Sequence, residues 1–352
     1  MARMGRFCKA AGGEFRHSGP DSATLEATAI RRRRVVGYGG DMSVVAVVNQ
    51  KGGVGKTTVV LGLAASAWAA GARVVVVDLD PQANATTGLG VFGPTSTVDD
   101  ALAVDRPGSL AEVLTVADWP DTGKQPLVAP SSPALAVREP QLANDPIGAQ
   151  DRLAVAIQGI DADLVLIDCP PSLGLLTVNG LFAADRALVV TEPGAWASDG
   201  VQQIVRSIER VAGRRSQPLE FAGIAVNKLG RTRDARYWHE QLVLDHGERC
   251  LPPIRQRAAL PEAAAQSLPI HSLAPRAGAS EAAAEFDVLY RIVGLGQPAP
   301  EVEEPDAGVP DPANPAAPRD GAGNGAATTA SAPWAPAGAG SAPEGGRTDG
   351  GL

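Results

Sequence analysis

Nine residues between an apolar stretch and an alanine-rich stretch have the composition of a phosphate-binding loop. Glycines in such a loop let successive backbone N–H groups turn inward around phosphate oxygens, and a helix that follows adds its positive end. In this arrangement Lys56 reaches the β- and γ-phosphates of a nucleotide, and the Thr57 hydroxyl ligates Mg²⁺. The residues that we expect to bind the nucleotide are Lys51, Gly52, Gly53, Val54, Gly55, Lys56, Thr57 and Thr58.

The loop departs from the usual pattern at its first position, where Gln50 stands in place of glycine. Lys51 consequently lies inside the loop, and its ammonium can contact a phosphate, including one bound to a facing subunit. Only 5 of the 31 basic residues of the chain are lysines, and two of them fall in this stretch. This concentration favours a phosphate-binding role over incidental placement.

Two aspartates follow apolar runs at points where strands are expected to end. Asp168 closes the run Leu164–Asp168, and an Asp at a strand tip beside a phosphate loop can hold Mg²⁺ through water. Asp80 begins a Gly/Asn/Thr-rich segment that we expect to be mobile, and its carboxylate can orient an attacking water or contribute to the Mg²⁺ site. The alternative for each residue is that it caps a helix or a turn.

A carboxamide follows a third apolar run, in Ala225-Val226-Asn227-Lys228. The Asn227 side chain can hydrogen-bond to a purine through its oxygen and its nitrogen, and we expect it to contact the base. The alternative is that Asn227 satisfies a turn.

The elements that must position these residues alternate along the chain. Apolar, β-branched runs predict strands, and Ala-rich or 3.6-periodic stretches predict helices. The predicted strands are residues 43–49, 73–78, 125–129, 164–168, 187–191 and 221–227, and the predicted helices are 57–70, 173–183, 198–212 and 280–293. This alternation predicts an α/β fold with a doubly wound, mostly parallel sheet and helices on both faces. Each candidate residue then falls at the carboxyl end of a strand, where such sheets bind ligands.

Composition divides the 352 residues into three parts. Residues 1–41 hold 8 basic and 4 acidic residues, and we expect an extension that is either disordered or not translated. Residues 42–296 form the predicted nucleotide-binding domain. Residues 297–352 contain 10 Pro, 10 Gly and a net charge of −6, a composition typical of a disordered tail.

Several classes of protein are disfavoured by the sequence. The three cysteines, Cys8, Cys169 and Cys250, are scattered and form no disulfide framework or Cys-x-x-Cys pair. The apolar runs are too short to span a bilayer, and the first residues lack the apolar stretch of a signal peptide. Secreted and integral-membrane proteins are therefore not expected.

Three segments together resemble the signature segments of the ParA/Soj partition ATPases, a deviant Walker-A group within the ParA/MinD superfamily of P-loop NTPases. They are KGGVGKTT at 51–58, VDLDPQANATTGLG at 77–90 and LVLIDCPPSLGLLTVNGL at 164–181. The resemblance covers about residues 44–293 and is weaker in the last third.

This resemblance implies a slow ATPase with ATP and Mg²⁺ as cofactors and two nucleotides held between the subunits of a homodimer. By that likeness Lys51 is the signature lysine and Lys56 the Walker lysine, while Thr57 is the Mg²⁺ ligand. Asp80 matches the residue needed for hydrolysis and Asp168 the Walker-B aspartate. The resemblance further implies non-specific DNA binding in the ATP state, a ParB-like activator, and a cytoplasmic protein associated with the nucleoid.

Two stretches depart from the family, and both bear on the partner and cargo. Residues 191–200, TEPGAWASDG, replace a Gln-x-Glu-Tyr-Phe-Ala-Leu stretch, and residues 251–257 match an Ile-Pro-Arg-Asn segment only loosely. Alternatives therefore stay open: a relative that positions a protein assembly of division or polar growth, a membrane-associated ATPase like MinD, or a metabolic P-loop ligase.

DNA binding would depend on local arginine clusters, because residues 42–296 carry a net charge of −6. Arg206 and Arg210 lie one turn apart on a predicted helix, and Arg231 and Arg233 follow the sixth strand. We expect these four residues to contact DNA phosphates without reading bases. Arg255 and Arg257 are further candidates, and solvation of helix faces is the alternative for each arginine.

Overall fold

The computed structural model of this chain describes residues 42–120, 124–273 and 275–297. All of them belong to the first of the two units into which the chain divides, Met1–Glu301. The predicted extension at residues 1–41 and, apart from Gln297, the predicted tail lie outside the described residues.

The described residues are organised around one twisted sheet with the strand order β3-β4-β2-β5-β1-β6-β7-β8. All neighbouring strands are parallel except β3 and β4, which pair antiparallel at one edge. The strands are β1 (Ser43–Val48), β2 (Val74–Asp78), β3 (Thr115–Val116), β4 (Leu127–Ala129), β5 (Leu164–Asp168), β6 (Arg186–Thr191), β7 (Glu220–Val226) and β8 (Cys250–Leu251).

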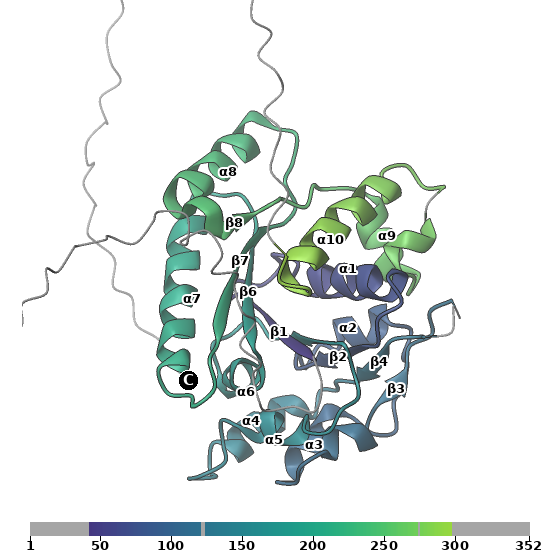
Figure 1. Cartoon of the computed structure of the whole chain (residues 1–352), viewed down its shortest axis with the longest axis vertical. Coiled ribbons are helices and arrows are strands. Elements are labelled where there is room, and N and C mark those ends of the chain that lie inside the picture. The colour runs from purple at the N-terminus through teal and green to yellow at the C-terminus, as the bar shows by residue number, and fades with distance from the viewer. Residues whose placement is uncertain (1–41, 121–123, 274, 298–352) are drawn as a thin grey trace, which may run out of the picture. The chain divides into compact units, whose positions relative to one another are not determined.

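Helices cover both faces of this sheet (Figure 1). The α-helices are α1 (Lys56–Ala69), α2 (Asn84–Gly88), α3 (Val98–Ala103), α4 (Leu135–Leu142), α5 (Arg152–Ala156), α6 (Leu175–Ala183), α7 (Ala197–Ala212), α8 (Arg233–His246), α9 (Ala259–Ala265) and α10 (Ala279–Val293). Three 3₁₀ turns complete the described elements: η1 (Ser109–Glu112), η2 (Gly247–Arg249) and η3 (Ile270–Leu273).

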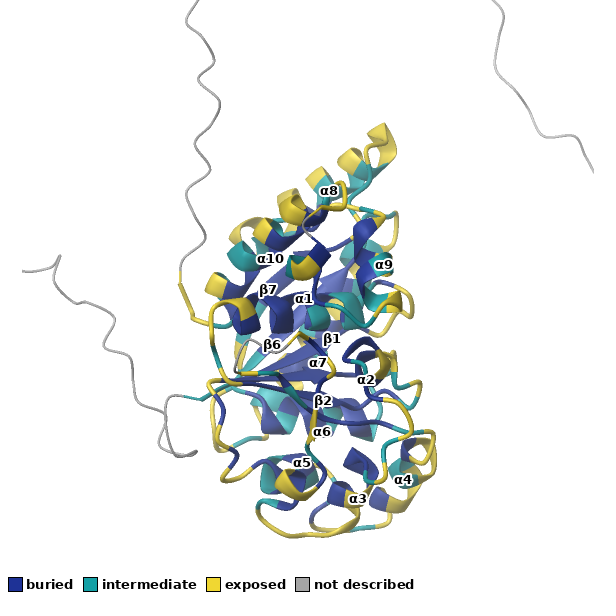
Figure 2. Ribbon diagram, turned by 90° about the vertical axis from the view of Figure 1, so that its right-hand side faces the viewer, coloured by how far each residue is buried: buried dark blue, intermediate teal, exposed yellow. Residues whose placement is uncertain are grey.

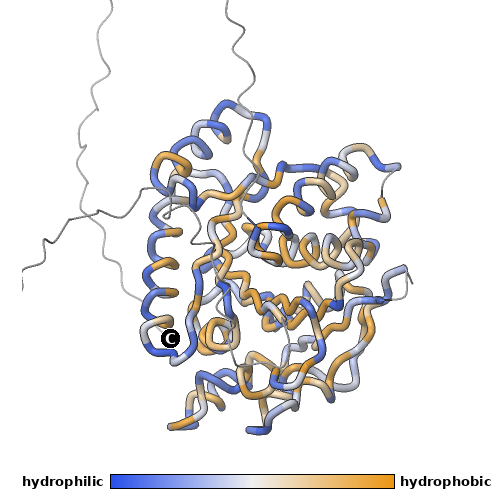
Figure 3. Tube along the Cα trace, viewed as in Figure 1, coloured by the Kyte–Doolittle hydropathy of each residue, from blue (hydrophilic) through white to orange (hydrophobic). Residues whose placement is uncertain are grey.

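The strands form the core because they are apolar on both faces, which Figure 3 shows as orange along the centre of the trace. Alternate residues of β1 belong to two different apolar clusters. Val45 and Val47 share one cluster with residues of α1, α9 and α10, whereas Val44 and Ala46 share the other with residues of α3, α5, α6 and α7. In the first cluster the ring of Phe286 on α10 lies over Gly62 of α1, where a Cβ would overlap it.

The predicted fold class is confirmed, and the main strands and helices are found within about two residues of the expected limits. The sequence missed β3 and β8 because two-residue strands carry no periodicity. It also missed the short helices α2, α3, α4, α5 and α9, and the longer α8, of which only Leu242 is buried. Figure 2 shows this helix as a mostly exposed projection at one end of the described structure.

Candidate functional site

The predicted site residues of the loop and the strand ends meet at the carboxyl edge of the central strands. The register of the sheet sets Asp78 of β2 opposite Asp168 of β5, and Val47 of β1 opposite Asp168 on the other side. The glycine-rich loop follows β1 directly, and Asn227 follows β7. Positions that are far apart in the sequence therefore converge because parallel strands end at one edge.

The loop from Gly52 to Gly55 has the backbone shape of an anion cradle. Gly53 and Gly55 adopt left-handed conformations, with φ of 79° and 90°, and a Cβ on Gly55 would overlap the side-chain amide of Asn227. Within the described chain, none of the backbone amides from Gly52 to Thr58 donates a hydrogen bond. This run of free donors at the start of α1, with Thr57 and Thr58 in its first turn, fits a phosphate chain.

Beside this loop, Thr57 and Asp168 are brought together at the tip of β5. The Thr57 hydroxyl donates to Asp168 Oδ2 at 2.7 Å. The other oxygen of the buried Asp168 carboxylate, Oδ1, has no hydrogen-bond partner among the described residues. An unpaired carboxylate oxygen next to a threonine hydroxyl is a donor set that Mg²⁺ prefers.

Lys56 supplies positive charge to this group of carboxylates. Its side chain is buried, and burial lowers its pKa even though Asp168 and Asp80 act in the opposite direction. Burial, together with the neighbouring Asp78 carboxylate, raises the pKa of Asp168. Burial also raises the pKa of Asp78, to about 6. The site therefore concentrates negative charge in a poorly solvated place, as a cation-binding site requires.

Asp80 lies two residues beyond the end of β2 and is buried. Its Oδ1 accepts a hydrogen bond from the Gln82 amide at 3.0 Å. No three His, Cys, Asp or Glu side chains are grouped to hold a metal ion in the described part of the chain. The predicted contribution of Asp80 to a Mg²⁺ site therefore stays a prediction.

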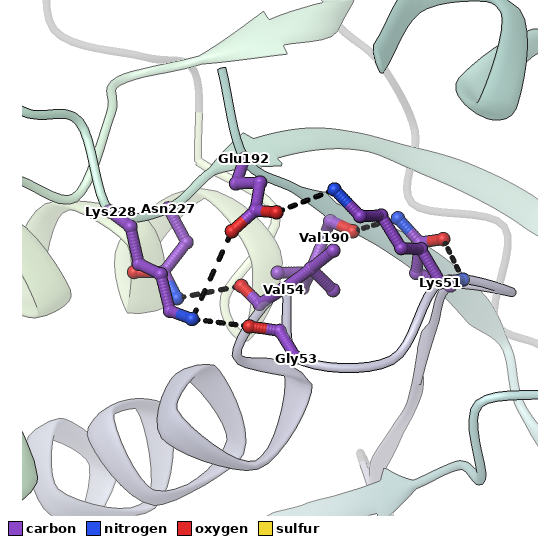
Figure 4. Close-up of polar contacts among 8 residues, drawn as sticks. Lys51, Gly53, Val54, Val190, Glu192, Asn227 and Lys228 are labelled. Atoms are coloured by element: carbon purple, nitrogen blue, oxygen red, sulfur yellow. Dashed lines mark hydrogen bonds and ion pairs between the residues drawn. The ribbon is translucent and has the colours of Figure 1, made fainter. Parts of the chain in front are cut away.

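Asn227 is buried against the loop. Its Nδ2 donates to the Val54 carbonyl at 3.0 Å, while its Oδ1 has no partner among the described residues (Figure 4). The side chain thus fastens β7 to the loop and retains one acceptor for a purine amino group.

The next residue, Lys228, was missed by the sequence analysis. It adopts a left-handed conformation, with φ of 56°, which is uncommon for a residue with a side chain. Its ammonium donates to the Gly53 carbonyl and lies 3.9 Å from Glu192 (Figure 4). The sequence showed only that a lysine follows Asn227. It could not predict that Lys228 contacts the loop, because the left-handed backbone conformation has no sequence pattern of its own.

The Lys51 side chain reaches toward Glu192, the residue that follows β6. Its side chain is 68 % exposed, and its ammonium donates to Glu192 Oε1 at 2.6 Å (Figure 4). The two residues line an open hollow of about 340 Å³ together with Trp196, which is 82 % exposed. Glu192 and Trp196 belong to the stretch where the sequence departs from the ParA pattern.

The predicted DNA-contacting arginines form two separate pairs. Arg206 and Arg210 lie on the second half of α7, whereas Arg233 begins α8 and Arg231 lies two residues before it. The start of α7 meets the end of α8, where Ser198 Oγ and His246 Nε2 are 3.2 Å apart. The pairs therefore lie at the far ends of these two helices. All four arginines are exposed, and none of them forms an ion pair with another described residue.

Arg255 and Arg257 are not free in the same way. Glu285 on α10 accepts hydrogen bonds from Arg257 at 2.5 and 2.8 Å and from the Arg255 side chain at 2.9 Å. Although burial alone would raise the pKa of Glu285, these hydrogen bonds hold that pKa below its ordinary value. The structure thus shows a charged partner for the two further candidates.

Of the helices that the structure describes, none is long and apolar enough to span a bilayer.

Comparison with known proteins gives a consistent family. A family model described as an AAA domain matches residues 42–221. The chain is 40 % identical over 185 residues to the chromosome partitioning protein ParA of Myxococcus xanthus, covering 51 % of this chain and 63 % of that protein. It is 39 % identical over 197 residues to the ParA of Caulobacter vibrioides, covering 54 % and 71 %.

A solved structure is similar over nearly its whole length. It is described as cobyrinic acid a,c-diamide synthase from Mycobacterium smegmatis with bound ATP analog and magnesium. The two chains are 31 % identical with a TM-score of 0.60, over 74 % of this chain and 98 % of the other.

Proposed function

This chain belongs to the ParA family of P-loop ATPases, and on that premise we propose that it is a nucleotide-dependent dimer that binds DNA non-specifically and acts in chromosome or plasmid partition. It is an ATPase with ATP and Mg²⁺ as cofactors. The proposal adds homodimerisation in the ATP state, DNA binding and stimulation by a ParB-like partner.

One observation supports the dimer above all others: the two lysines of the loop occupy opposite environments. Lys56 is buried near the carboxylates of Asp168 and Asp80, whereas the side chain of Lys51 is 68 % exposed and pairs with Glu192. An ammonium that faces outward from a phosphate loop is placed to contact a phosphate held by another subunit. Its partner Glu192 is then exchanged for a phosphate oxygen of higher charge.

Within one subunit, each site residue has a task that its surroundings allow. The amides of Gly52–Thr58 and the Lys56 ammonium would hold the phosphates, and Asn227 Oδ1 would accept a hydrogen bond from the base. Asp168 and Thr57 would hold Mg²⁺, which when bound offsets negative charge on the phosphates. These roles rest on the free amides and on the unpaired oxygens of Asp168 and Asn227.

Asp80 would orient the water that attacks the γ-phosphate. A carboxylate is a weak base, and most catalysis of phosphoryl transfer comes from positioning and charge. A slow basal rate follows, so that the bound nucleotide acts as a timer for DNA binding and release.

The proposed dimer can be tested with substitutions of Lys51 and of its partner Glu192. In Mg-ATP, the variant Asp80→Ala should accumulate as a dimer that is retained on DNA at low salt. Adding Lys51→Gln should weaken self-association by about tenfold or more, because a charge-assisted bond to phosphate is lost. Adding Glu192→Gln instead should leave the dimer intact, since Glu192 pairs with Lys51 and Lys228 of its own subunit and would itself contact no phosphate. Light scattering and DNA retention are the measurements.

Two outcomes would change the proposal. A monomeric Asp80→Ala variant in saturating Mg-ATP would contradict the ATP-dependent dimer. A dimer that is not retained on DNA at low salt would favour the alternative of a ParA-like ATPase that positions a protein assembly.

A metabolic ligase is the second candidate, and the similarity to the Mycobacterium smegmatis synthase structure favours it. A ligase would turn over ATP only with a small-molecule acceptor, and DNA would have no effect on its rate. The exposed Lys51 disfavours this candidate, because a monomeric ligase site needs no outward-facing ammonium in the loop.

A further inference from the structure

Like Asp168, Asp78 is a carboxylate enclosed at this edge of the sheet, and none of the roles proposed for the loop residues uses it. Its exposed fraction is 0 %, and it is the last residue of β2. Three donors contact its carboxylate: the Asp80 amide at 3.1 Å, the Thr86 amide at 2.8 Å and the Thr86 hydroxyl at 2.7 Å. Burying a carboxylate costs free energy unless hydrogen bonds satisfy it, so these three hydrogen bonds hold the donor groups of Asp80 and Thr86 in place.

The hydrogen bonds continue from Thr86 to a third segment and then return to Asp80. The Thr86 hydroxyl accepts from the Ser131 amide at 2.9 Å, and the Ser131 hydroxyl donates to the Asp80 carbonyl at 2.6 Å. Thr86 and Ser131 are both 2 % exposed. Both polar groups of the Asp80 main chain, its N–H and its C=O, are therefore bonded to this closed ring of contacts.

Part of the segment after Asp80 is helical. Residues 84–88 form the short helix α2, entered through Ala83 in a left-handed conformation with φ of 55°. The Ala83 amide also donates to the Asp80 carbonyl, at 2.9 Å. The direction in which the Asp80 side chain leaves the main chain is thus set by groups on β2, on α2 and after β4.

We propose that Asp78, Thr86 and Ser131 form a positioning bracket that holds Asp80 in the orientation needed for hydrolysis. The inference rests on the proposed role of Asp80, and it assigns the bracket no contact with nucleotide or metal. An aspartate suits this position because both of its oxygens accept hydrogen bonds, whereas an asparagine would present an NH₂ group to one of the donors.

The bracket can be separated from a general effect on folding by comparing two adjacent threonines of α2. Thr86→Val removes the hydroxyl that joins Asp78 to Ser131 with little change of volume. Thr87→Val makes the same chemical change at an exposed position, where the hydroxyl donates only to the Ala83 carbonyl. Thr86→Ser keeps the hydroxyl and serves as the conservative variant, and Ser131→Ala removes only the bond to the Asp80 carbonyl.

The expected result is a split between rate and affinity. Single-turnover hydrolysis in the full chain should slow about 10- to 100-fold for Thr86→Val, because small misplacements of a reacting group have effects of this size. Ser131→Ala should slow it about 3- to 10-fold, since one hydrogen bond of the bracket is lost. The dissociation constant for Mg-ATP should change less than about twofold in both variants. Thr86→Ser and Thr87→Val should hydrolyse ATP close to the wild-type rate.

A thermal unfolding curve for each variant completes the test. Hydrolysis that is unchanged in folded Thr86→Val would overturn the bracket. So would a parallel loss of rate and Mg-ATP affinity, or a failure of Thr86→Ser to restore the rate.

The Asp80→Ala variant distinguishes this inference from the proposed function. If it still hydrolyses ATP at the wild-type rate, the role proposed for Asp80 fails, whatever the bracket does. If Asp80→Ala retains only a small residual rate, adding Thr86→Val should not lower that rate further, because the bracket acts only through Asp80. A further loss of the residual rate would mean that Thr86 acts on catalysis by another route.

Discussion

The phosphate-loop edge differs in its construction from the surface that carries Arg206 and Arg210 of α7 and Arg231 and Arg233 around the start of α8. At the loop edge, the charged side chains Lys56, Asp78 and Asp168 are buried and held by segments that are distant in the sequence. On α7 and just before α8, Arg206 and Arg231 are exposed and form no ion pair with another described residue. In the first region each charged side chain is held in one orientation, whereas in the second the charged side chains are exposed and are not held by a charged partner among the described residues.

This difference indicates how each region responds to substitution. Removing one buried charge leaves its neighbours unpaired in a poorly solvated place, so that effects at the loop edge should be large and specific. Removing one exposed arginine changes only a sum of screened attractions, so that effects on the helices should be small, additive and dependent on salt.

The largest effect is expected for Lys56→Ala. It removes the buried ammonium that faces Asp168 and Asp80, and it should reduce ATP affinity by about 100-fold or more. Isothermal titration calorimetry with Mg-ATP measures this directly. Lys124→Ala is the matched control, because the Lys124 ammonium donates to the Gly71 carbonyl at an exposed position. Retained ATP affinity in Lys56→Ala would refute the assignment of the loop.

A smaller effect, on the salt dependence of DNA binding, is expected for the arginines at and just before the start of α8. Arg231→Ala with Arg233→Ala should flatten the dependence of log affinity for DNA on log salt by about 2, since each lost phosphate contact removes about 0.9 of slope. Affinity for ATP should not change. The measurement is DNA binding of the Asp80→Ala form at several salt concentrations. A slope equal to that of the parent protein would show that these arginines do not contact DNA.

The smallest effect is expected where an arginine is already held by a carboxylate. Glu285→Gln should raise DNA affinity by about two- to fivefold, because Arg255 and Arg257 lose an ion-pair partner. Glu281→Gln makes the same charge change on α10 and should raise the affinity less. An equal gain in both variants would indicate a general effect of charge.

The lowered pKa of Glu285 predicts that the free energy of unfolding depends on pH, which chemical unfolding at several pH values measures. Its pKa in the folded state lies below that in the unfolded state, so its contribution to the unfolding free energy is present above the ordinary carboxyl range. That contribution is lost as the pH falls through the folded-state pKa. Glu285→Gln should remove this part of the pH dependence.

The sequence predicted those parts of the molecule that depend on local pattern. The apolar runs located the central strands, and the strand ends located Asp80, Asp168 and Asn227 at one edge of the sheet. The bracket at Asp78 could not be predicted, because it joins β2, α2 and the segment after β4 through hydrogen bonds that leave no periodicity. The contact of Glu192 with Lys51 was missed for the same reason, since the two residues are 141 positions apart.

The exposed ring of Trp196 gives the loop edge an optical property. Trp68 and Trp119 are buried and pack edge to face, with ring centroids 6.0 Å apart, so their emission should change little when the surface is covered. Trp196 borders the hollow that contains Lys51 and Glu192, and its indole is surrounded by solvent. A second subunit that closes over this hollow should shift its fluorescence to shorter wavelength. The difference from the spectrum of Trp196→Phe would then follow assembly in real time without any label.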